Sequence, residues 1–395
     1  INSLIGKEIP KETVKNILKS LEIDVILENE TQMQLAVPTY RVDVQRDVDV
    51  IEDILRIYGY NNITPGTDVR SSLTFSEKPD SHHLQNLISE QLTGNGFSEI
   101  MNNSLTKSAY YENLTSYPVS NSVRLLNPLS ADLNVMRQTL LFGGLESIAY
   151  NANRRNANLR FYEFGNCYYY KAENKTADNA LAPYSENFHL GLWITGNRVS
   201  QSWAQADEKT SVYELKAYVE NILRRLGFDL RKLSLTEFSD DLLSSALKIS
   251  TRQGETLAIY GIVGNKQRKA FGIDNDVFFA DLHWNNLLSA SKKHKVAFSE
   301  LPKYPEVKRD LALLLDKNIT FAEIEKLARK TESKLLKNVN LFDVYEGKNL
   351  EEGKKSYAVG FTLQDENATL TDVRIDAVMQ KFIKAFEENI GAKIR

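Results

Sequence analysis

The chain has 395 residues, too many for one ordinary core, and 42% of them are hydrophobic and 26% charged, so a soluble globular protein of two or three domains is expected. A formal net charge of −3 gives no whole-chain attraction to nucleic acid or to an anionic membrane. The single cysteine, Cys167, excludes an intrachain disulfide and a cysteine-based zinc site, and the five histidines show no metal-ligand spacing.

Residues 1–75 are expected to form a small winged-helix-like domain. A helix is predicted to open at Pro10, strands are predicted over 24–27 and 33–37, and a second helix is predicted from Asp49 onward. This segment holds 8 Lys and Arg against 12 Asp and Glu. DNA binding, a usual role of winged helices, fits that acidic balance poorly, so no DNA partner is expected.

The second helix carries an unusual concentration of acidic side chains. Asp49, Glu52 and Asp53 stand at i, i+3 and i+4 and share one helix face. Asp43 lies one extended segment earlier and can fold back over the helix start. Four converging oxygen donors suit Mg²⁺, but the helix dipole also favours acids in a first turn. Ion pairing offers a further interpretation, with three nearby cations: Arg41, Arg46 and Arg56.

Residues 76–298 are expected to form a mostly antiparallel sheet flanked by helices, because strands follow one another with few crossover helices. The predicted helices are around Leu84–Leu92, Leu140–Asn151 and Tyr213–Leu226. The predicted strands are 159–170, 188–194, 246–251, 256–263 and 277–282. Cys167 is interpreted as a buried strand thiol. Trp193 and Trp203 are expected to serve core or loop packing. This order of elements resembles the catalytic fold of class II aminoacyl-tRNA synthetases.

An active class II member resembling this chain would need two arginines that hold the ATP phosphates. The local counterpart of the first is Leu159-Arg160-Phe161-Tyr162-Glu163, where an Arg-to-Glu spacing of three places the two charged side chains on opposite faces of the strand. The counterpart of the second, the passage from Phe278 to Trp284, contains no arginine and no glycine. We therefore interpret this domain as a class II-like core without catalytic residues.

Residues 299–395 are predicted to form a ferredoxin-like βαββαβ domain. Helices are expected over 321–331, with a Thr320–Glu323 capping box, and over 372–389. Strands are expected over 307–315, 335–345, 356–363 and 392–395. Tyr357, Val359 and Phe361 alternate and should face the helices. The 17 Lys and Arg against 16 Asp and Glu from Lys303 onward do not by themselves suggest RNA.

Several longer motifs resemble one family across the whole chain. PTYRVDVQRDVDVIEDILRIYGYNNI resembles the metal-binding domain of the bacterial phenylalanyl-tRNA synthetase β subunit, and PEVKRDLALLLD, LFDVYEGKNL and TLTDVRID resemble its ferredoxin-fold anticodon-binding domain. The resemblance implies Mg²⁺ binding, with the family's four acids falling on Asp43, Asp49, Glu52 and Asp53. Asp53 replaces the usual Glu and is one methylene shorter.

The resemblance also implies partners and roles. Catalysis and ATP binding are expected on a separate α subunit, in an assembly of two α and two β chains that attaches phenylalanine to its tRNA. Asn127-Pro128-Leu129-Ser130 followed by Met136-Arg137 resembles a family segment that lines the subunit junction or the mouth of the active site, and Arg137 is assigned to the subunit interface. Anticodon contacts are expected from exposed aromatic and basic side chains: Arg309, Phe342, Tyr345, Lys354, Lys355 and Arg395.

Two other interpretations remain open. The first is an active ligase with displaced arginines, for which Arg160 and Arg137 are candidates. The second is a free-standing RNA-binding or scaffold paralogue that never meets an α subunit. No signal peptide or long apolar run is apparent, so a cytoplasmic location without a membrane partner is expected. Because the chain begins at Ile1 inside an ordered-looking element, we expect it to be a piece of a longer protein.

Overall fold

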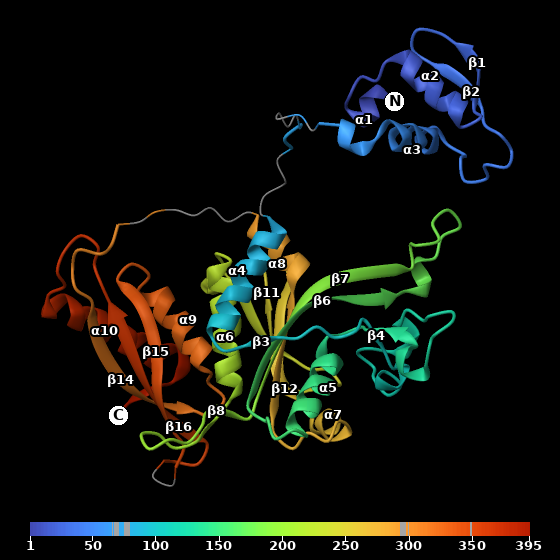
Figure 1. Ribbon diagram of the computed structural model, residues 1–395. Helices are drawn as coiled ribbons and strands as arrows, with labels where there is room; N and C mark the ends of the chain where they lie inside the picture. Colours follow the sequence, from blue (N-terminus) through green and yellow to red (C-terminus); the bar gives the residue numbers. More distant parts are fainter. Residues whose placement is uncertain (65, 67–70, 75–79, 293–297, 299, 348–349) are drawn as a thin grey trace. The chain divides into compact units, whose positions relative to one another are not determined.

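The computed structural model describes residues 1–64, 66, 71–74, 80–292, 298, 300–347 and 350–395 (Figure 1). The chain divides into two compact units, Ile1–His83 and Leu84–Arg395. The expected boundaries after residues 75 and 298 fall on or beside residues outside the described ranges. The three-domain division therefore stays a prediction.

The described residues of the N-terminal unit that precede α4 (Ser81–Gly94) form three α-helices, one β-hairpin and a short 3-10 helix, Tyr60–Asn62. Its elements are α1 (Asn2–Ile5), α2 (Lys11–Ser20), β1 (Asp24–Glu28), β2 (Met33–Ala36) and α3 (Asp47–Tyr58). β1 and β2 pair antiparallel. Val14, Ile17 and Leu18 recur on one face of α2 and pack against Val50 and Ile54 of α3 in a small core. The predicted winged-helix-like order of helix, β-ribbon and helix is confirmed, with α1 added in front.

A seven-stranded sheet is the centre of the second unit, in the order β10-β11-β12-β13-β7-β6-β3. All neighbours pair antiparallel except β3 and β6, which are parallel. The strands are β3 (Ser98–Glu99), β6 (Leu159–Tyr170), β7 (Tyr184–Thr195), β10 (Ser234–Phe238), β11 (Leu243–Ser250), β12 (Thr256–Val263) and β13 (Val277–His283). The predicted antiparallel sheet is confirmed, and β3 and β10 were not predicted.

Helices cover both faces of this sheet (Figure 1). One face packs against α4 (Ser81–Gly94), α6 (Val212–Arg225) and α8 (Trp284–Ser291). The other face packs against α5 (Leu141–Ala152), and α7 (Asn265–Ala270) lies in the connection between β12 and β13. Because the central strands are covered on both sides, β6 and β7 are buried along much of their length rather than alternating between core and solvent.

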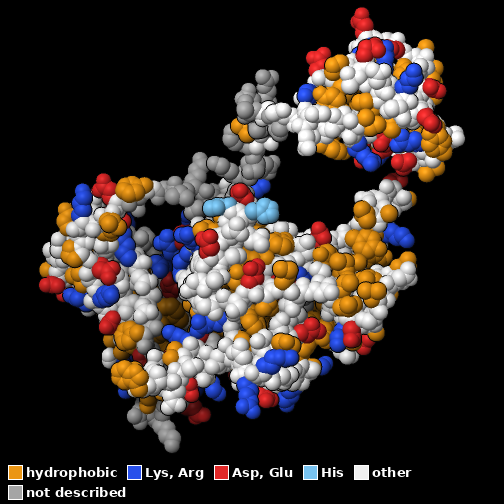
Figure 2. Space-filling model, in the orientation of Figure 1, with side chains coloured by type: hydrophobic (Ala, Val, Ile, Leu, Met, Phe, Trp, Pro, Cys, Tyr) orange, Lys and Arg blue, Asp and Glu red, His pale blue; other side chains and the backbone are white. Residues whose placement is uncertain are grey.

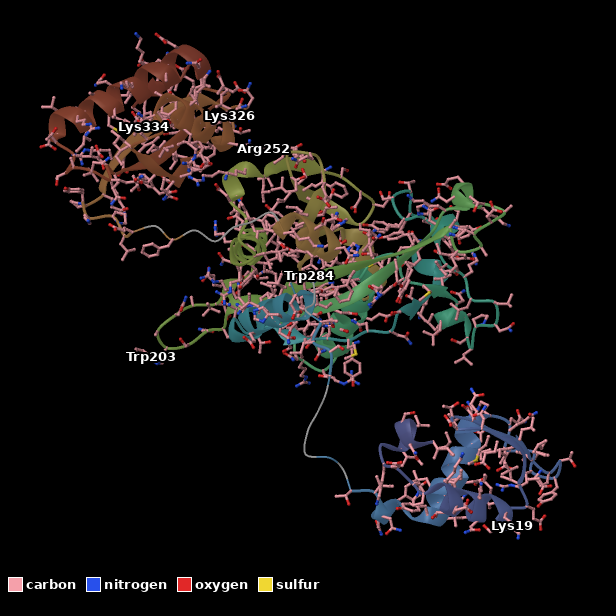
Figure 3. All side chains as sticks on the ribbon, turned by 90° about the horizontal axis from the view of Figure 1, so that it is seen from above. Lys19, Trp203, Arg252, Trp284, Lys326 and Lys334 are labelled. Carbon is pink, nitrogen blue, oxygen red and sulfur yellow. The ribbon has the colours of Figure 1, made fainter. Side chains whose placement is uncertain are left out.

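Short pairings complete this part of the chain. They are β4 (Leu105–Thr106) with β5 (Val135–Met136), and β8 (Asn197–Val199) with β9 (Glu208–Lys209). Trp284 is fully buried at the start of α8, whereas Trp203 is completely exposed in the loop between β8 and β9 (Figure 3). Trp193 is buried as expected, but the expected packing role of Trp203 is wrong, because no side chain in the described chain covers its ring.

The C-terminal residues form a four-stranded antiparallel sheet in the order β15-β16-β14-β17. The elements are β14 (Val307–Asp316), α9 (Phe321–Thr331), β15 (Leu336–Tyr345), β16 (Lys354–Leu363), α10 (Asp372–Ile390) and β17 (Lys393–Ile394). Val359 and Phe361 are fully buried against the helices. Thr320 and Glu323 form the predicted capping box. The predicted ferredoxin-like order and its inward-facing residues are confirmed.

Candidate functional site

The first candidate site is the acidic start of α3. The carboxylate of Asp49 accepts hydrogen bonds from the backbone N–H groups of Arg46 at 2.8 Å and Gln45 at 3.0 Å, and it pairs with the Arg46 guanidinium at 2.9 Å. The Arg46 side chain, followed by these backbone N–H groups, lowers the pKa of Asp49 to about 2. Asp49 therefore acts as a helix cap whose charge already has partners.

The other three expected metal ligands have different surroundings. Asp53 forms an ion pair with Arg41, with Nη2 and Oδ2 2.6 Å apart. Asp43 and Glu52 are exposed and make no hydrogen bond or ion pair with any described residue. The four carboxylates do not form a cluster with oxygens within 4.8 Å of one another. As they stand they do not fit an inner-sphere Mg²⁺ site, because two of the four are already neutralised by arginine.

Arg160, one of the two candidates for a displaced ATP-binding arginine, forms an ion pair with another residue of this chain. Its Nη2 atom lies 3.1 Å from Oε1 of Glu214, in the first turn of α6. Its guanidinium also donates to the backbone carbonyls of Asn95 and Arg198, each at 3.3 Å. Arg160 is therefore fixed by an acid and two carbonyls of the chain itself.

Arg137, expected at a subunit interface, lies inside the core with only 6% of its surface exposed. Its Nη1 atom lies 2.5 Å from Oε1 of the buried Glu163, and its Nε atom donates to the carbonyl of Asn166 at 2.9 Å. Gly165 makes this possible, because a Cβ at that position would clash with Nη2 of Arg137. Glu163 and Arg160 belong to opposite faces of β6, as the spacing predicted.

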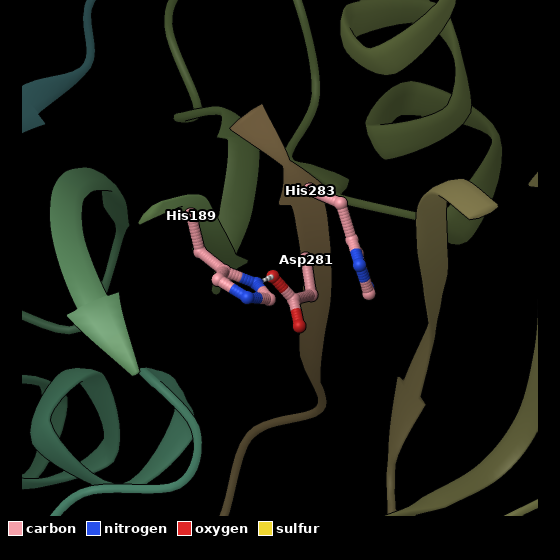
Figure 4. Close-up of side chains that lie close together, drawn as sticks. All are labelled: His189, Asp281 and His283. Carbon is pink, nitrogen blue, oxygen red and sulfur yellow. Dashed lines mark hydrogen bonds and ion pairs between the residues drawn. The ribbon is translucent and has the colours of Figure 1, made fainter. Parts of the chain in front are cut away.

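The structure assembles one cluster that the sequence did not reveal. His189 of β7 and Asp281 and His283 of β13 have potential ligand atoms that all lie within 4.8 Å of one another (Figure 4). Nδ1 of His189 and Oδ1 of Asp281 are 2.6 Å apart. The sequence spacing of these two histidines did not indicate this proximity. Their 94-residue separation hid it, and the one signal available was that Asp281 and His283 alternate onto one strand face.

Burial and charge act against each other in this cluster. Burial lowers the pKa of His189, but the nearby Asp281 carboxylate outweighs it and the net shift is upward. Burial likewise raises the pKa of Asp281, and His189 outweighs it, so the net shift is downward. Burial dominates at His283 and lowers its pKa. The arrangement therefore favours the charged form of His189 paired with Asp281 and the neutral form of the His283 imidazole.

The open face of the C-terminal sheet, opposite α9 and α10, carries part of the expected RNA-binding set. Phe342 is exposed and its ring lies over Gly360, whose neighbours Val359 and Phe361 face the helices. Tyr345 pairs in register with Ser356 on the same face. Lys354 forms a 2.8 Å ion pair with Asp316. The backbone N–H of the exposed Arg395 donates to the carbonyl of Ala312.

Two members of the expected RNA-binding set lie elsewhere. Lys355 is only 6% exposed, and its ammonium group contacts both the hydroxyl and the ring of Tyr357 on the helix-facing side. Arg309 pairs with Asp372 at the start of α10, with an Nη2–Oδ1 distance of 3.4 Å. The structure thus brings Phe342 and Tyr345 to the open face and leaves Lys355 and Arg309 off it.

Hydrophobic side chains gather on the surface around β4 and the nearby end of the β6–β7 hairpin (Figure 2). Leu126 and Leu129, which we call the apolar patch, are 94% and 95% exposed. Leu126 and Leu129 lie in the segment that hydrogen bonds to β4 through Asn134. Single exposed leucines are ordinary, but two almost fully exposed leucines in one short segment offer an apolar surface to a partner.

None of the helices in the described part of the chain is long and apolar enough to cross a membrane.

Three family models match the chain in succession. Residues 1–60 match the tRNA synthetase B5 domain, residues 65–284 match the phenylalanyl-tRNA synthetase beta chain CLM domain, and residues 302–395 match the ferredoxin-fold anticodon-binding domain.

Similar curated proteins include the phenylalanine–tRNA ligase beta subunits of Bacteroides fragilis, 62% identical, and of Porphyromonas gingivalis, 50% identical. Each alignment covers all of this chain and 48% of the relative, so the chain spans about half the length of these proteins. Among solved structures, a pyrrolysyl-tRNA synthetase from Desulfitobacterium hafniense aligns with 72% of this chain and 91% of its own, at 12% identity and a TM-score of 0.41.

Proposed function

Because the chain belongs to the phenylalanyl-tRNA synthetase beta chain family, we propose that it acts as part of the β subunit of a phenylalanine–tRNA ligase. In this proposal it supports the ATP-dependent attachment of phenylalanine to its tRNA by binding a catalytic α subunit and the tRNA. ATP is bound and used by the α subunit, in the cytoplasm, within an assembly of two α and two β chains. The 395 residues alone are non-catalytic.

The observation that carries this proposal is the apolar patch. Leu126 and Leu129 expose large hydrophobic side chains in a segment that hydrogen bonds to β4 through Asn134. Burying each one against a partner would contribute about 1.5–3 kcal/mol. A catalytic subunit that covers this surface would account for the exposure.

The non-catalytic role is supported by the partners of two arginines. Arg160 is held by Glu214, and Arg137 is enclosed with Glu163. Neither guanidinium is available to bind the phosphates of ATP unless its ion pair is broken, and for Arg137 that would leave Glu163 buried without a counter-charge. The alternative of an active ligase with these arginines as displaced clamps is therefore disfavoured.

Anticodon binding is proposed for the open face of the C-terminal sheet. Phe342 and Tyr345 offer exposed rings for base stacking, and Lys354 and Arg395 offer cations for phosphates. Lys355 is too enclosed to contribute directly, and Arg309 would first have to leave Asp372. Stacking on aromatic rings is typically worth about 1–3 kcal/mol per base, so the two aromatics are the stronger candidates.

A Mg²⁺ site at Asp43, Asp49, Glu52 and Asp53 is proposed on the condition that the ion pairs of two of these acids open. Asp43 and Glu52 are available, but Asp49 and Asp53 would have to give up Arg46 and Arg41. Contact with the α subunit is one event that could reorganise these ion pairs. No step of the function is derived from the metal.

The test is co-purification of the 395-residue chain with the α subunit of a bacterial phenylalanine–tRNA ligase, followed by aminoacylation. Leu129→Glu introduces a charge into the apolar patch and is expected to weaken the complex at least tenfold. Leu301→Glu, at another highly exposed leucine, is the matched control and should bind like the parent chain.

The outcomes separate the two remaining functions. A complex that Leu129→Glu weakens, with aminoacylation requiring both chains, supports the subunit role. No complex with a well-folded α subunit would overturn it. Salt-sensitive binding of unrelated RNAs without preference would then favour the free-standing RNA-binding or scaffold function.

A further inference from the structure

We propose that His189, Asp281 and His283 form a binding site for one divalent transition metal ion, of which Zn²⁺ is the representative. The site lies in the central sheet and does not depend on the proposed subunit role. It is also separate from the acidic helix α3, which carries the expected Mg²⁺ ligands.

The register of the sheet brings the three side chains together. β7 and β13 pair antiparallel, and His189 stands directly opposite His283 in that pairing. Opposite residues have Cβ atoms about 4.5–5.5 Å apart, which explains how residues far apart in sequence meet. Asp281 lies two residues before His283, so its side chain emerges on the same face of the sheet. The site is therefore built on rigid strands rather than on loops.

The donor set has the chemistry of a transition-metal site. Two imidazole nitrogens and one carboxylate oxygen suit Zn²⁺, and three protein ligands are the usual number where the fourth position is left to water or another small ligand. Mg²⁺ prefers an all-oxygen octahedral shell and is not expected here. The three ligand atoms lie within 4.8 Å of one another, whereas a tetrahedral Zn²⁺ site needs about 3.4 Å between ligands for bonds of about 2.0–2.1 Å. Modest side-chain rotations would close the set.

Ligand positions are available on all three residues. His189 and Asp281 use one atom each in their mutual contact, and the imidazole of His283 makes no hydrogen bond with any described residue, although its ring lies 4.6 Å from that of His189. In Figure 4 a dashed line joins the His189 ring to the Asp281 carboxylate, and His283 comes from the same strand as Asp281. His189 and Asp281 are buried, whereas His283 is partly exposed, which gives an ion a route to the site.

The charges around the cluster tolerate a cation. Arg137 is a positive group that lowers the pKa of His189, and its own charge is balanced by Glu163 at 2.5 Å. Without a metal, the carboxylate of Asp281 is balanced only through His189. A metal ion that replaces the His189 proton would keep Asp281 paired and would add His283 as a ligand. The competing interpretation is a purely structural His–Asp pair with a bystander histidine.

The experiment titrates the metal-free 395-residue chain with Zn²⁺ and, separately, with Co²⁺, whose visible absorption reports tetrahedral coordination. Three variants are compared with the parent chain: His283→Ala removes the partly exposed ligand, Asp281→Asn is nearly isosteric, and His82→Ala/His83→Ala removes an adjacent histidine pair on the surface of α4. Circular dichroism and the urea midpoint show that each variant is folded.

We expect one tightly bound Zn²⁺ per chain, at least tenfold weaker binding in His283→Ala and in Asp281→Asn, and no change in the His82→Ala/His83→Ala control. The Co²⁺ absorption should disappear in the first two variants, and excess Mg²⁺ should displace neither ion. The proposal is overturned if no Zn²⁺ binds tightly, if the surface histidine pair accounts for the bound ion, or if folded His283→Ala binds Zn²⁺ as well as the parent chain does.

Discussion

Arginine–carboxylate pairs occur in both compact units, but they are enclosed to different degrees. In the central sheet, Arg137 and Glu163 are 8% and 1% exposed at the side chain, with backbone and amide groups satisfying their remaining donors and acceptors. In the N-terminal unit, Arg46 is 73% exposed while it holds Asp49. The chemistry of the pairs is the same, yet the first is locked by desolvation and the second can exchange its partner for water, a metal or another chain.

The degree of burial decides which role each arginine–carboxylate pair is suited to. A pair inside a core cannot open without leaving a charge in a poor solvent, so Arg137 is a structural residue in the described chain. A pair at a surface can open at small cost, so the acids of α3 remain available for a partner. Substitutions at four positions test this difference between buried and exposed ion pairs.

Removing Arg137 should cause the largest loss of stability. Arg137→Met leaves the buried Glu163 without its counter-charge, which typically costs about 3–5 kcal/mol of unfolding free energy. Urea denaturation measures the loss. Arg160→Ala is the control at a more exposed pair and should cost about 1 kcal/mol or less. In the double variant Arg137→Met/Glu163→Leu much of the loss should be recovered, and equal losses in Arg137→Met and Arg160→Ala would break the comparison.

Filling the space beside Arg137 should have the next largest effect. In Gly165→Ala the new Cβ would meet Nη2 of Arg137 and would lie 3.2 Å from Cδ2 of Leu140, so the packed pair must shift. Overpacking of this kind costs about 1–3 kcal/mol, again measured by urea denaturation. Gly94→Ala is the matched control, because its Cβ would meet open space at the end of α4. An unchanged stability in Gly165→Ala would show that Arg137 is not held tightly.

Asp49 should make the stability of the N-terminal unit depend on pH in acid. Its folded-state pKa of about 2 lies below the unfolded value of about 3.9, so its contribution is present above pH 4 and is lost as the pH falls toward 2. Asp49→Asn should lower the midpoint temperature of unfolding at pH 7. At pH 2 the midpoint temperatures of the variant and the parent chain should lie closer together. Thermal unfolding followed by circular dichroism measures both. A difference that does not change between pH 7 and pH 2 would contradict the capping role.

Breaking the Arg41–Asp53 pair should have the smallest effect on folding. Arg41→Ala is expected to cost about 1–2 kcal/mol, less than a change at Arg137, because the two side chains keep 17% and 13% of their surface exposed and Asp53 can be partly hydrated. Arg56→Ala, at an exposed arginine of the same helix, is the control. If the acids of α3 can take Mg²⁺, Arg41→Ala should also strengthen Mg²⁺ binding a few-fold relative to Arg56→Ala in a calorimetric titration. A loss above 3 kcal/mol would place this pair with Arg137 instead.

Much of the fold follows from local patterns. The apolar periodicity of α2 and α6, the strand 159–170 and the Thr320–Glu323 capping box are all present where they were predicted. The βαββαβ order also follows from the sequence of its segments. β10 was missed because four of its five residues are exposed and it lies at the edge of the sheet, so it shows no apolar alternation.

The candidate sites were less predictable, because their partners are distant in sequence. The shared face of Asp49, Glu52 and Asp53 was apparent from helical spacing, but the capture of Asp53 by Arg41 depends on how the preceding loop folds back. Lys355 was proposed as a surface cation, and the strand places it against Tyr357 instead. Arg137 follows a motif typical of a junction, yet Gly165 and Glu163 provide a buried position for it.

The family, the succession of helices and strands, and the buried face of each element can be predicted from the sequence. Local patterns of side chains a few residues apart are enough to specify them. Which charged side chains form ion pairs depends on the tertiary structure. Sheet register placed His189 opposite His283, and core packing enclosed Arg137 with Glu163. Such contacts depend on register and depth, and a local pattern specifies that a side chain faces inward without specifying what it meets there.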